Sequence, residues 1–185
     1  MAKKYTITTK GDGVSATRDM MIAYLNTGTA DAPVWSAMGT KVTDSSIEYD
    51  WSMETITDIL GVVHTKAKTA QMTQSFADSE IVAGDAVLNH LVNLAVVQKD
   101  ASVLVNQDML IVHTYLKSED GGTFAERYPA SAVIPTTIGG EGGAALVSTI
   151  DVTYGGNRSI GDAVVENGTV TFTPETAETA ETEEV

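Results

Sequence analysis

The stretch QSFADSEIVAGDAVLNHL, residues 74–91, combines a polar turn region, an acidic helix cap and the start of the only amphipathic helix that the sequence predicts. Asp85 is a good N-cap because its carboxylate can accept hydrogen bonds from the free amides of the first turn. The apolar residues that follow at helical spacing form a single stripe of Val87, Leu88, Leu91, Leu94 and Ala95. We expect the helix to span about 86–99, and since it is too short to be stable alone, it must lie on a sheet.

The chain on both sides of this helix predicts β-strands. Ile47, Tyr49 and Trp51 alternate with acidic residues, the clearest period of two in the sequence. Pro129 and Pro135 confine their strand to a sheet edge or to bulges. We expect an antiparallel β-sandwich or barrel with one flanking helix, a mainly-β (α+β) fold. The expected strands are 20–38 (as a hairpin), 47–51, 62–75, 102–105, 108–117, 123–137, 146–154 (with Leu146, Ile150, Val152 and Tyr154 facing inward) and 164–172 (as a hairpin around Asn167-Gly168).

The length of 185 residues predicts one domain with tails. Residues 1–17 are polar and rich in Gly and Thr, which is typical of an arm that orders only on docking. Residues 18–173 would form the domain, with a long loop over 39–60. Residues 174–185 are acidic and of low complexity, so we expect them to be disordered.

The net charge of −14 bears on possible partners. An acidic surface repels phosphate backbones, which argues against tight binding of nucleic acid. It is compatible with a surface past which nucleic acid slides without sticking, and equally with simple solubility. The sequence has no Cys and no apolar run near the ~20 residues of a membrane span. We therefore expect no membrane association and a protein made in the cytosol.

No catalytic, cofactor-binding or metal-binding residues can be assigned, so we do not expect an enzyme. Residues 140–145 match a dinucleotide-binding glycine pattern, but a strand follows where that site needs a helix. His64, His90 and His113 lack ligand spacing. The acidic run over 44–58 lacks the close oxygen spacing and central Gly of a calcium loop.

The expected strand 62–75 has two semi-polar faces, and neither is apolar enough for a monomer core. Such a strand suits a subunit interface or a channel wall, or equally a solvent-facing edge of a sheet.

Four stretches, taken in their order along the chain, resemble a known family. They are IEYDW to DILG (47–61), QSF to GDAV (74–87), FAERY to IGGEGG (124–143) and IDVTYGG to SIG (150–161). Together they resemble the major tail tube proteins of long-tailed (siphovirus-type) bacteriophages, and more distantly the tube proteins of contractile tails and type VI secretion. The resemblance covers roughly residues 18–172. The chain departs from the family in having Asp85-Ala86 where aspartate–proline is usual, and in its acidic tail.

The resemblance implies a structural virion protein. Six copies would close their inner sheets into one barrel, and the rings would stack into a tube that conducts DNA and a tape-measure protein. Besides further copies of itself, its partners would be the tape-measure, tail-tip and terminator proteins. It would reside in the tail of the virion, after assembly in the cytoplasm of a host bacterium, with no cofactor and no membrane.

The resemblance also assigns surfaces. The loop 39–60 would contact the neighbouring ring through Glu48, Asp50, Trp51, Glu54 and Asp58. The lumen would be lined by one face of 62–75 (Thr65, Thr69, Gln71, Thr73) or by the polar face of 146–154 (Thr149, Asp151, Thr153).

The alternative function is a sandwich-type module that binds carbohydrate or protein. A β-rich hydrolase rests only on scattered carboxylates.

Overall fold

The computed structural model describes residues 3–175. The fold is mainly antiparallel β, with 49% of the chain in strands, a sandwich-like sheet and one flanking helical segment of 13 residues. This confirms the fold class that the sequence predicts. The described residues form no closed barrel on their own.

The chain divides into two compact units. Among the described residues, the first unit contains 3–38, 108–129 and 156–175, and the second contains 39–107 and 130–155. Strand β9 (Thr123–Gly139) contributes its first half to the first unit and its second half to the second. The chain therefore passes from one unit to the other four times.

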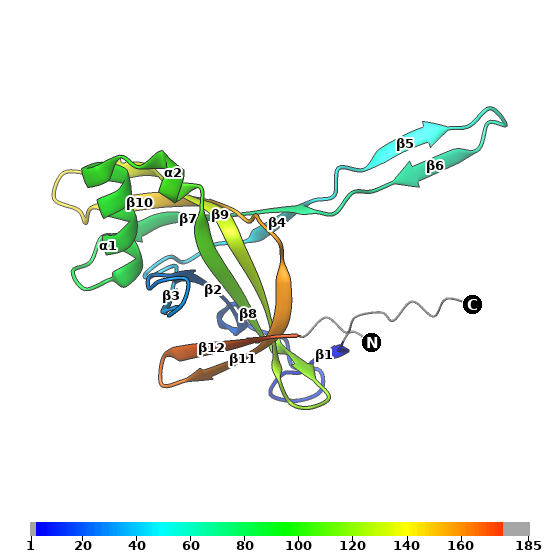
Figure 1. Ribbon diagram of the computed structural model, residues 1–185, viewed down its shortest axis with the longest axis horizontal. Coiled ribbons are helices and arrows are strands. Elements are labelled where there is room, and N and C mark those ends of the chain that lie inside the picture. The colour runs from blue at the N-terminus through cyan, green and yellow to red at the C-terminus, as the bar shows by residue number, and fades with distance from the viewer. Residues whose placement is uncertain (1–2, 176–185) are drawn as a thin grey trace. The chain divides into compact units, whose positions relative to one another are not determined.

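The first unit is an antiparallel sheet in the order β3-β2-β8-β9, to which β1 is added on β8 and β11 on β9 (Figure 1). Asn167 and Gly168 both have positive φ, 49° and 78°, in the tight turn between β11 and β12. This is the hairpin that Asn-Gly predicts. The elements are β1 (Tyr5–Ile7), η1 (Arg18–Met20), β2 (Met21–Asn26), β3 (Trp35–Ala37), β8 (Gln107–Ser118), β11 (Ser159–Glu166) and β12 (Thr169–Pro174).

The core of the first unit is built from every second residue of β8. Leu110 and Val112 pack into a cluster with residues of five other strands, namely Tyr24, Trp35, Ala125, Ala163 and Val170. At the rim, the Arg127 guanidinium donates two hydrogen bonds to the Asp108 carboxylate, at 2.9 and 2.8 Å. A bidentate pair of this kind fixes the alignment of β8 and β9.

A buried polar network crosses the same unit and is centred on Glu126. Its carboxylate contacts His113 Nε2 at 3.0 Å and accepts hydrogen bonds from the Tyr128 hydroxyl at 2.8 Å and Arg158 Nε at 2.7 Å. Burial disfavours the charged form, but these hydrogen bonds and the charge of Arg158 outweigh it and hold the pKa of Glu126 below its usual range.

Replacing Glu126 with Gln should lower the free energy of unfolding by about 2 kcal/mol at pH 7, because Arg158 and His113 lose a charged acceptor. The folded-state pKa is depressed, so the carboxylate stabilises the fold above the ordinary pKa near 4.5 and loses this effect as pH falls through the folded value. Glu126→Gln should therefore be less sensitive to acid than the wild type. Urea unfolding at pH 7, 5 and 3 measures this, with the exposed Glu166→Gln as control. An acid response equal to that of the wild type would contradict it.

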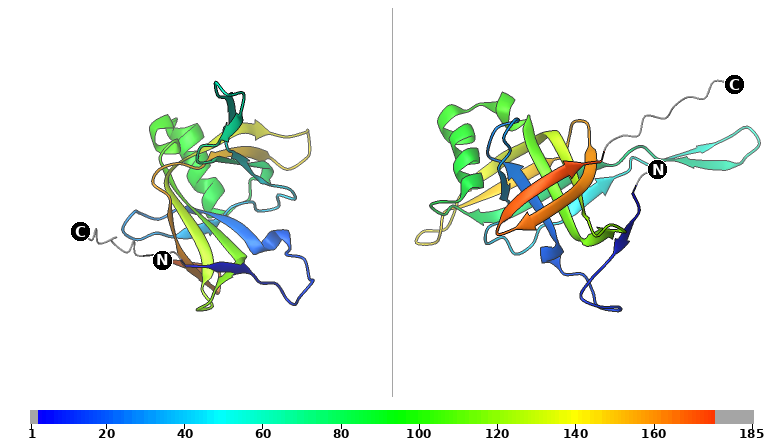
Figure 2. Two further views of the ribbon diagram at one scale, coloured as in Figure 1. Left: turned by 90° about the vertical axis from the view of Figure 1, so that its right-hand side faces the viewer. Right: turned by 60° about the horizontal axis from the view of Figure 1, so that its bottom comes forward.

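The second unit is a sheet in the order β9-β10-β7-β4, with the helical segment beside β7 and β10 (Figures 1 and 2). A separate two-stranded hairpin, β5–β6, belongs to the same unit. The elements are β4 (Ile47–Asp50), β5 (Glu54–Thr57), β6 (Val63–Lys66), β7 (Gln71–Glu80), α1 (Ala86–Val92), η2 (Asn93–Gln98), α2 (Ala101–Leu104) and β10 (Val147–Thr153).

The helical segment begins where the sequence places it. The Asp85 carboxylate accepts a hydrogen bond from Leu88 N at 2.9 Å, and the stripe residues Val87, Leu88, Leu91 and Leu94 are all buried. From Asn93 to Gln98 the segment is a π-helix, which Lys99 ends in the left-handed conformation with φ 53°.

Several predicted boundaries are wrong. Residues 74–80 form the end of strand β7 rather than a turn. The expected strand 102–105 is largely the helical turn α2, because the Asp100 carboxylate caps the Ser102 and Val103 amides. Leu146 is exposed instead of facing inward.

The proline-containing strand was expected to lie at a sheet edge or to contain bulges, and β9 has strands on both sides, so it is not an edge strand. The predicted bulge is present where the register with β10 shifts opposite Pro135. Pro129 lies where β9 changes partner, after the residues paired with β11 and before those paired with β10.

The ends of the chain were expected to be an arm and a disordered tail. Within the expected arm, Tyr5–Ile7 pairs with the end of β8. Most of the acidic tail, 176–185, lies outside the described residues. No helix within 3–175 is long and apolar enough to span a bilayer.

Candidate functional site

The hairpin β5–β6 stands apart from the sheet of its own unit (Figure 1). Its strands pair from Glu54 opposite Lys66 to Thr57 opposite Val63, and within 3–175 they join no other strand. Every residue of both strands is exposed. A lone two-stranded hairpin is at best marginally stable in water, so this element lacks a partner surface in the single chain.

The turn of the hairpin is organised by Asp58. Its carboxylate accepts hydrogen bonds from Leu60 N at 2.8 Å and Val62 N at 2.9 Å, and lies 2.9 Å from His64 Nε2. The hydrogen bond with His64, followed by that from Val62, holds the pKa of Asp58 below its usual range. Gly61 has φ 79°, a conformation that favours glycine. Asp58 and Gly61 together shape a defined tip.

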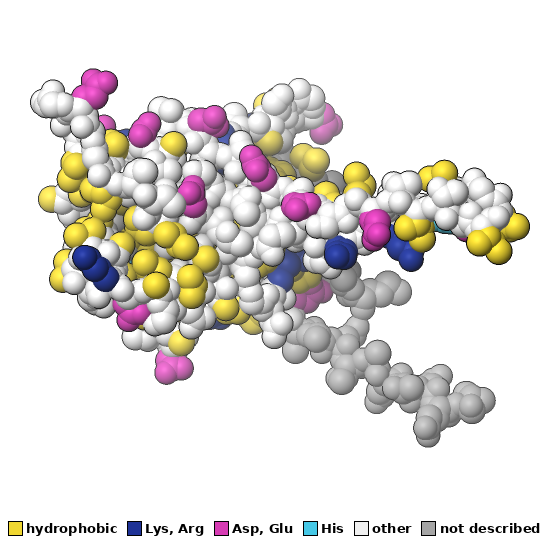
Figure 3. All heavy atoms as spheres, turned by 90° about the horizontal axis from the view of Figure 1, so that it is seen from above, with side chains coloured by type: hydrophobic (Ala, Val, Ile, Leu, Met, Phe, Trp, Pro, Cys, Tyr) yellow, Lys and Arg dark blue, Asp and Glu magenta, His cyan; other side chains and the backbone are white. Residues whose placement is uncertain are grey.

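The hairpin carries an unusual amount of exposed apolar surface. Ile59 is fully exposed and Leu60 is 83% exposed at the tip. Hydrophobic side chains are visible at the outer end of the hairpin in Figure 3, whereas acidic side chains are spread over the body of the molecule. Clustered exposed apolar side chains mark interaction sites. The other exposed apolar residues of the hairpin and its base are Trp51, Met53, Ile56, Val62 and Val63.

The base of the hairpin is narrow. Lys68 N donates to Trp51 O at 3.0 Å, and Ser52 adopts a left-handed φ of 41° while the Asp50 carboxylate accepts its amide at 2.8 Å. The rings of Tyr49 and Trp51 stack at 6.3 Å with an interplanar angle of 15°, and both are about half exposed. The Asp50 carboxylate therefore holds Ser52 in a left-handed turn at the base of the hairpin.

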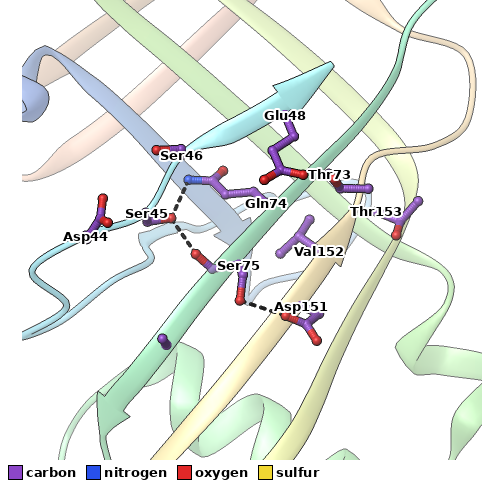
Figure 4. Close-up of a pocket in the computed structure, with 11 residues that line it drawn as sticks. Asp44, Ser45, Ser46, Glu48, Thr73, Gln74, Ser75, Asp151, Val152 and Thr153 are labelled. Carbon is purple, nitrogen blue, oxygen red and sulfur yellow. Dashed lines mark hydrogen bonds between the residues drawn. The ribbon is translucent and has the colours of Figure 1, made fainter. Parts of the chain in front are cut away.

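A second surface is the polar face of the strands β4, β7 and β10. Glu48 lies opposite Thr73, and Thr73 opposite Thr153, so the three side chains form a row across the strands. In the next row Ser75 Oγ donates to Asp151 Oδ1 at 2.7 Å (Figure 4). The face encloses a shallow hollow of about 550 Å³. Its lining has three carboxylates and no cation: Asp44, Glu48 and Asp151 with Ser45, Ser46, Thr73, Gln74, Ser75, Ala77, Val152 and Thr153.

A series of hydrogen bonds between buried polar side chains lies on the opposite side of these strands. Gln74 Nε2 donates to Ser45 Oγ at 2.9 Å, and Ser45 Oγ donates to Ser75 O at 2.7 Å (Figure 4). The Tyr154 hydroxyl donates to Gln74 Oε1 on the other side. These hydrogen bonds link the segment before β4 to β7 and to the end of β10. The strands that carry Glu48 and Asp151 are therefore held rigidly together.

The predicted lumen residues are only partly brought together. Gln71, Thr73, Thr149, Asp151 and Thr153 lie on the adjacent strands β7 and β10. The expected continuous strand 62–75 is wrong, because it is divided between β6 and β7. Thr65 therefore belongs to the hairpin, and Thr69 to the segment between it and the sheet.

The predicted stacking residues also divide between the two surfaces. Glu48 lines the hollow and Asp50 ends β4. Trp51, Glu54 and Asp58 belong to the hairpin or its base. The period of two in the sequence did not reveal that β6 returns to pair with β5, nor that Ile59 and Leu60 form the tip. Their signal is the apolar run ILGVV around Gly61, which is a short hairpin turn rather than the end of a loop.

Within 3–175, no group of three or more His, Asp or Glu side chains could hold a metal ion. His90 contacts Gln107, His64 contacts Asp58 and His113 contacts Glu126, so each histidine has a structural partner of its own.

No protein-family model and no curated protein matches the chain. Among solved structures, it is similar to the tube-terminating cap of an anti-feeding prophage, with 13% identity, a TM-score of 0.44, and coverage of 84% of this chain and 97% of that one. It is also similar to two chains of an extracellular contractile injection system (PVC). For the sheath/tube terminator in the extended state, the identity is 11%, the TM-score 0.45 and the coverage 81% and 99%. For the sheath–tube complex these values are 12%, 0.43, 82% and 94%.

Proposed function

We propose that the chain is a non-enzymatic structural subunit of a phage-type tail tube, in which copies form hexameric rings that stack around a hollow lumen. The observation that carries the proposal is the hairpin β5–β6. Its turn is held by hydrogen bonds to the Asp58 carboxylate, and both of its strands are exposed. It bears apolar side chains from base to tip. Such an element is suited to insertion into a neighbouring copy, where burial of these side chains would favour association.

The hairpin is the proposed ring-stacking element. Trp51, Glu54 and Asp58 keep the role that the resemblance gives them, but the contact surface extends over the returning strand and the tip. Glu48 and Asp50 lie on β4 and would act beside it rather than on it.

The edge of β4 is the proposed site of closure between subunits of one ring. Within 3–175, β4 pairs with β7 and with no other strand, so its other edge has no strand beside it. An open edge of this kind tends to pair with another strand. Six copies that join at such edges would form one closed barrel.

The polar face of β4, β7 and β10 is the proposed lumen wall. Its carboxylates Glu48 and Asp151 and its hydroxyls Thr73, Thr149 and Thr153 would present a negative surface without cations. A negative wall disfavours contact with phosphates, so DNA would pass without binding.

The remaining parts of the proposal follow the sequence resemblance. The tube would belong to a long-tailed, siphovirus-type virion and be assembled in a bacterial cytoplasm. It would contact tape-measure, tail-tip and terminator proteins and conduct DNA to the host.

We expect concentrated protein to form rings or tubes visible by negative-stain electron microscopy. In such an assembly the apolar side chains of the hairpin would be buried and the β4 edge would pair with another copy. Low and high salt should be compared, with and without the tail-tip proteins that nucleate assembly. Monomers that persist under every condition would contradict the proposal.

A second candidate is a carbohydrate-binding module, which one observation favours. Tyr49 and Trp51 are both half exposed and their rings are nearly parallel, so they offer aromatic ring faces of the kind on which a sugar ring can lie. A glycan array on monomeric protein separates the two functions. Specific binding that Trp51→Ala abolishes, without formation of tubes, would favour the module.

A further inference from the structure

The N-terminal segment binds a site on the first unit that contacts both its backbone and its side chains. We call this site the seat, and it consists of the end of β8 with Asp120, Phe124, Asp162 and Glu175. Tyr5, Thr6 and Ile7 lie opposite Ser118, Lys117 and Leu116 of β8 in antiparallel register. Thr8 N extends the pairing by donating to Tyr115 O at 2.8 Å. The contact is short, with only three residue pairs, and it covers the end of β8.

Two side chains of the segment anchor it. Lys3 Nζ lies 2.6 Å from Asp162 Oδ2 and 3.2 Å from Asp120 Oδ2. The Tyr5 hydroxyl donates to Asp162 Oδ1 at 3.2 Å, and its ring meets Phe124 edge-on at 4.8 Å. Burial, followed by the charge of Asp162, raises the pKa of Tyr5 to about 12. The seat therefore selects a cation and an aromatic ring two residues apart.

The seat is built by residues far from the segment in sequence. Asp162 is packed so closely on Gly122 that a Cβ there would lie 2.4 Å from its carboxylate. Glu175 accepts a hydrogen bond from the backbone N of Lys3 at 2.9 Å. None of these residues belongs to the linker that joins β1 to β2, so the seat does not require that the segment come from the same chain.

The linker between β1 and β2, residues 9–17, does not fix β1 to the rest of the unit. Residues 9–17 run outside the sheet as a loop (Figure 2), and nearly all are exposed. Among the described residues their hydrogen bonds are local: Thr9 Oγ1 donates to Gly11 O and Val14 O, Val14 N donates to Gly11 O, and Thr17 O accepts from Met20 N. A short docked strand on an exposed linker with only local hydrogen bonds can leave its site without disturbing the rest of the sheet, which exchange of the strand between copies requires.

We propose that β1 is exchanged between copies of this chain, so that it sits on its own β8 in the free subunit and on the β8 of a neighbour in the assembly. The contacts are the same in both cases, and only the effective concentration of the neighbouring seat decides between them. The inference rests on the proposed function in one respect, because stacked subunits supply that concentration. The exchanged strand would tie neighbours together without any new surface.

Disulfide trapping tests the exchange, since the chain has no Cys of its own. Thr6 and Lys117 lie directly opposite in the ladder, so Thr6→Cys and Lys117→Cys place two thiols within bonding range. The double variant at low concentration should close within one chain. An equimolar mixture of the two single variants, oxidised after assembly, should give disulfide-linked dimers. An Asp12→Cys and Lys117→Cys mixture sets the collisional background.

Dimers from the mixed single variants at no more than background, while the double variant closes internally, would overturn the exchange. Failure of the tail-tube proposal looks different, because electron microscopy would then show no tubes whatever the disulfide result. Linked dimers at high concentration without tubes would support exchange alone.

The seat itself is tested by Asp162→Asn, which removes the charge that Lys3 and Tyr5 share. Dimers from the mixed single variants should fall several-fold, and amide exchange of residues 5–8 in the free subunit should accelerate. Asp12→Asn makes the same charge change in the linker and should alter neither. Equal behaviour of the two variants would show that the side-chain anchors do not hold β1.

Discussion

Leu91→Asp should unfold the subunit. Leu91 has no exposed surface and lies in the centre of the buried stripe of the helical segment. An aspartate there would be an unpaired buried charge, and it would also lose the packing of a leucine side chain. The combined loss is about 5 kcal/mol or more, comparable to the whole stability of a domain of this size. Circular dichroism and urea titration of the purified variant measure it.

Val97→Asp is the matched control, because Val97 lies in the same helical segment but is 72% exposed. It should melt within a few degrees of the wild type. If Leu91→Asp also melts there and still assembles, the helical segment does not contribute to the core as the structure indicates.

Ile59→Asp with Leu60→Asp should abolish assembly and leave the subunit folded. Both side chains are exposed at the hairpin tip, so charges there cost the isolated subunit little. In a stacked ring they would be buried in the neighbour, where two unpaired charges would weaken each contact by orders of magnitude. Thermal melting should be unchanged, while electron microscopy and sedimentation should show no tubes.

Ile59→Val with Leu60→Val keeps the tip apolar and should assemble. Trp51→Ala, at the base of the hairpin, should also give a folded subunit that makes no tubes. Normal tubes from the double aspartate variant would exclude the tip from the stacking contact.

The sequence was sufficient for the helix and for the class of fold. Asp85 and the stripe from Val87 to Leu94 are local signals, because capping and helical spacing act within a few residues. The Asn167-Gly168 hairpin was predictable for the same reason, since two left-handed residues determine its turn.

The candidate site was less predictable because its features depend on pairing. Whether the polar strand 62–75 is continuous is decided by its partners: β6 pairs with β5, and β7 pairs with β4 and β10. The same holds for 102–105, where apolar β-branched residues favour a strand but the cap at Asp100 produces a helical turn. Long-range pairing is not written in the local pattern, so neither the hairpin nor the row from Glu48 to Thr153 could be located from it.

The four passages of the chain between the two units have a consequence for synthesis on the ribosome. The second unit is complete once residue 155 has emerged, but the first still lacks β11, β12 and Glu175 at that moment. Because a chain folds as its parts emerge, the sheet with the hairpin can form before the sheet that receives β1. The seat for the N-terminal segment is then the last part of the subunit to be made, although the segment itself is the first to be translated. A nascent chain would thus carry its N-terminal strand unseated through most of translation.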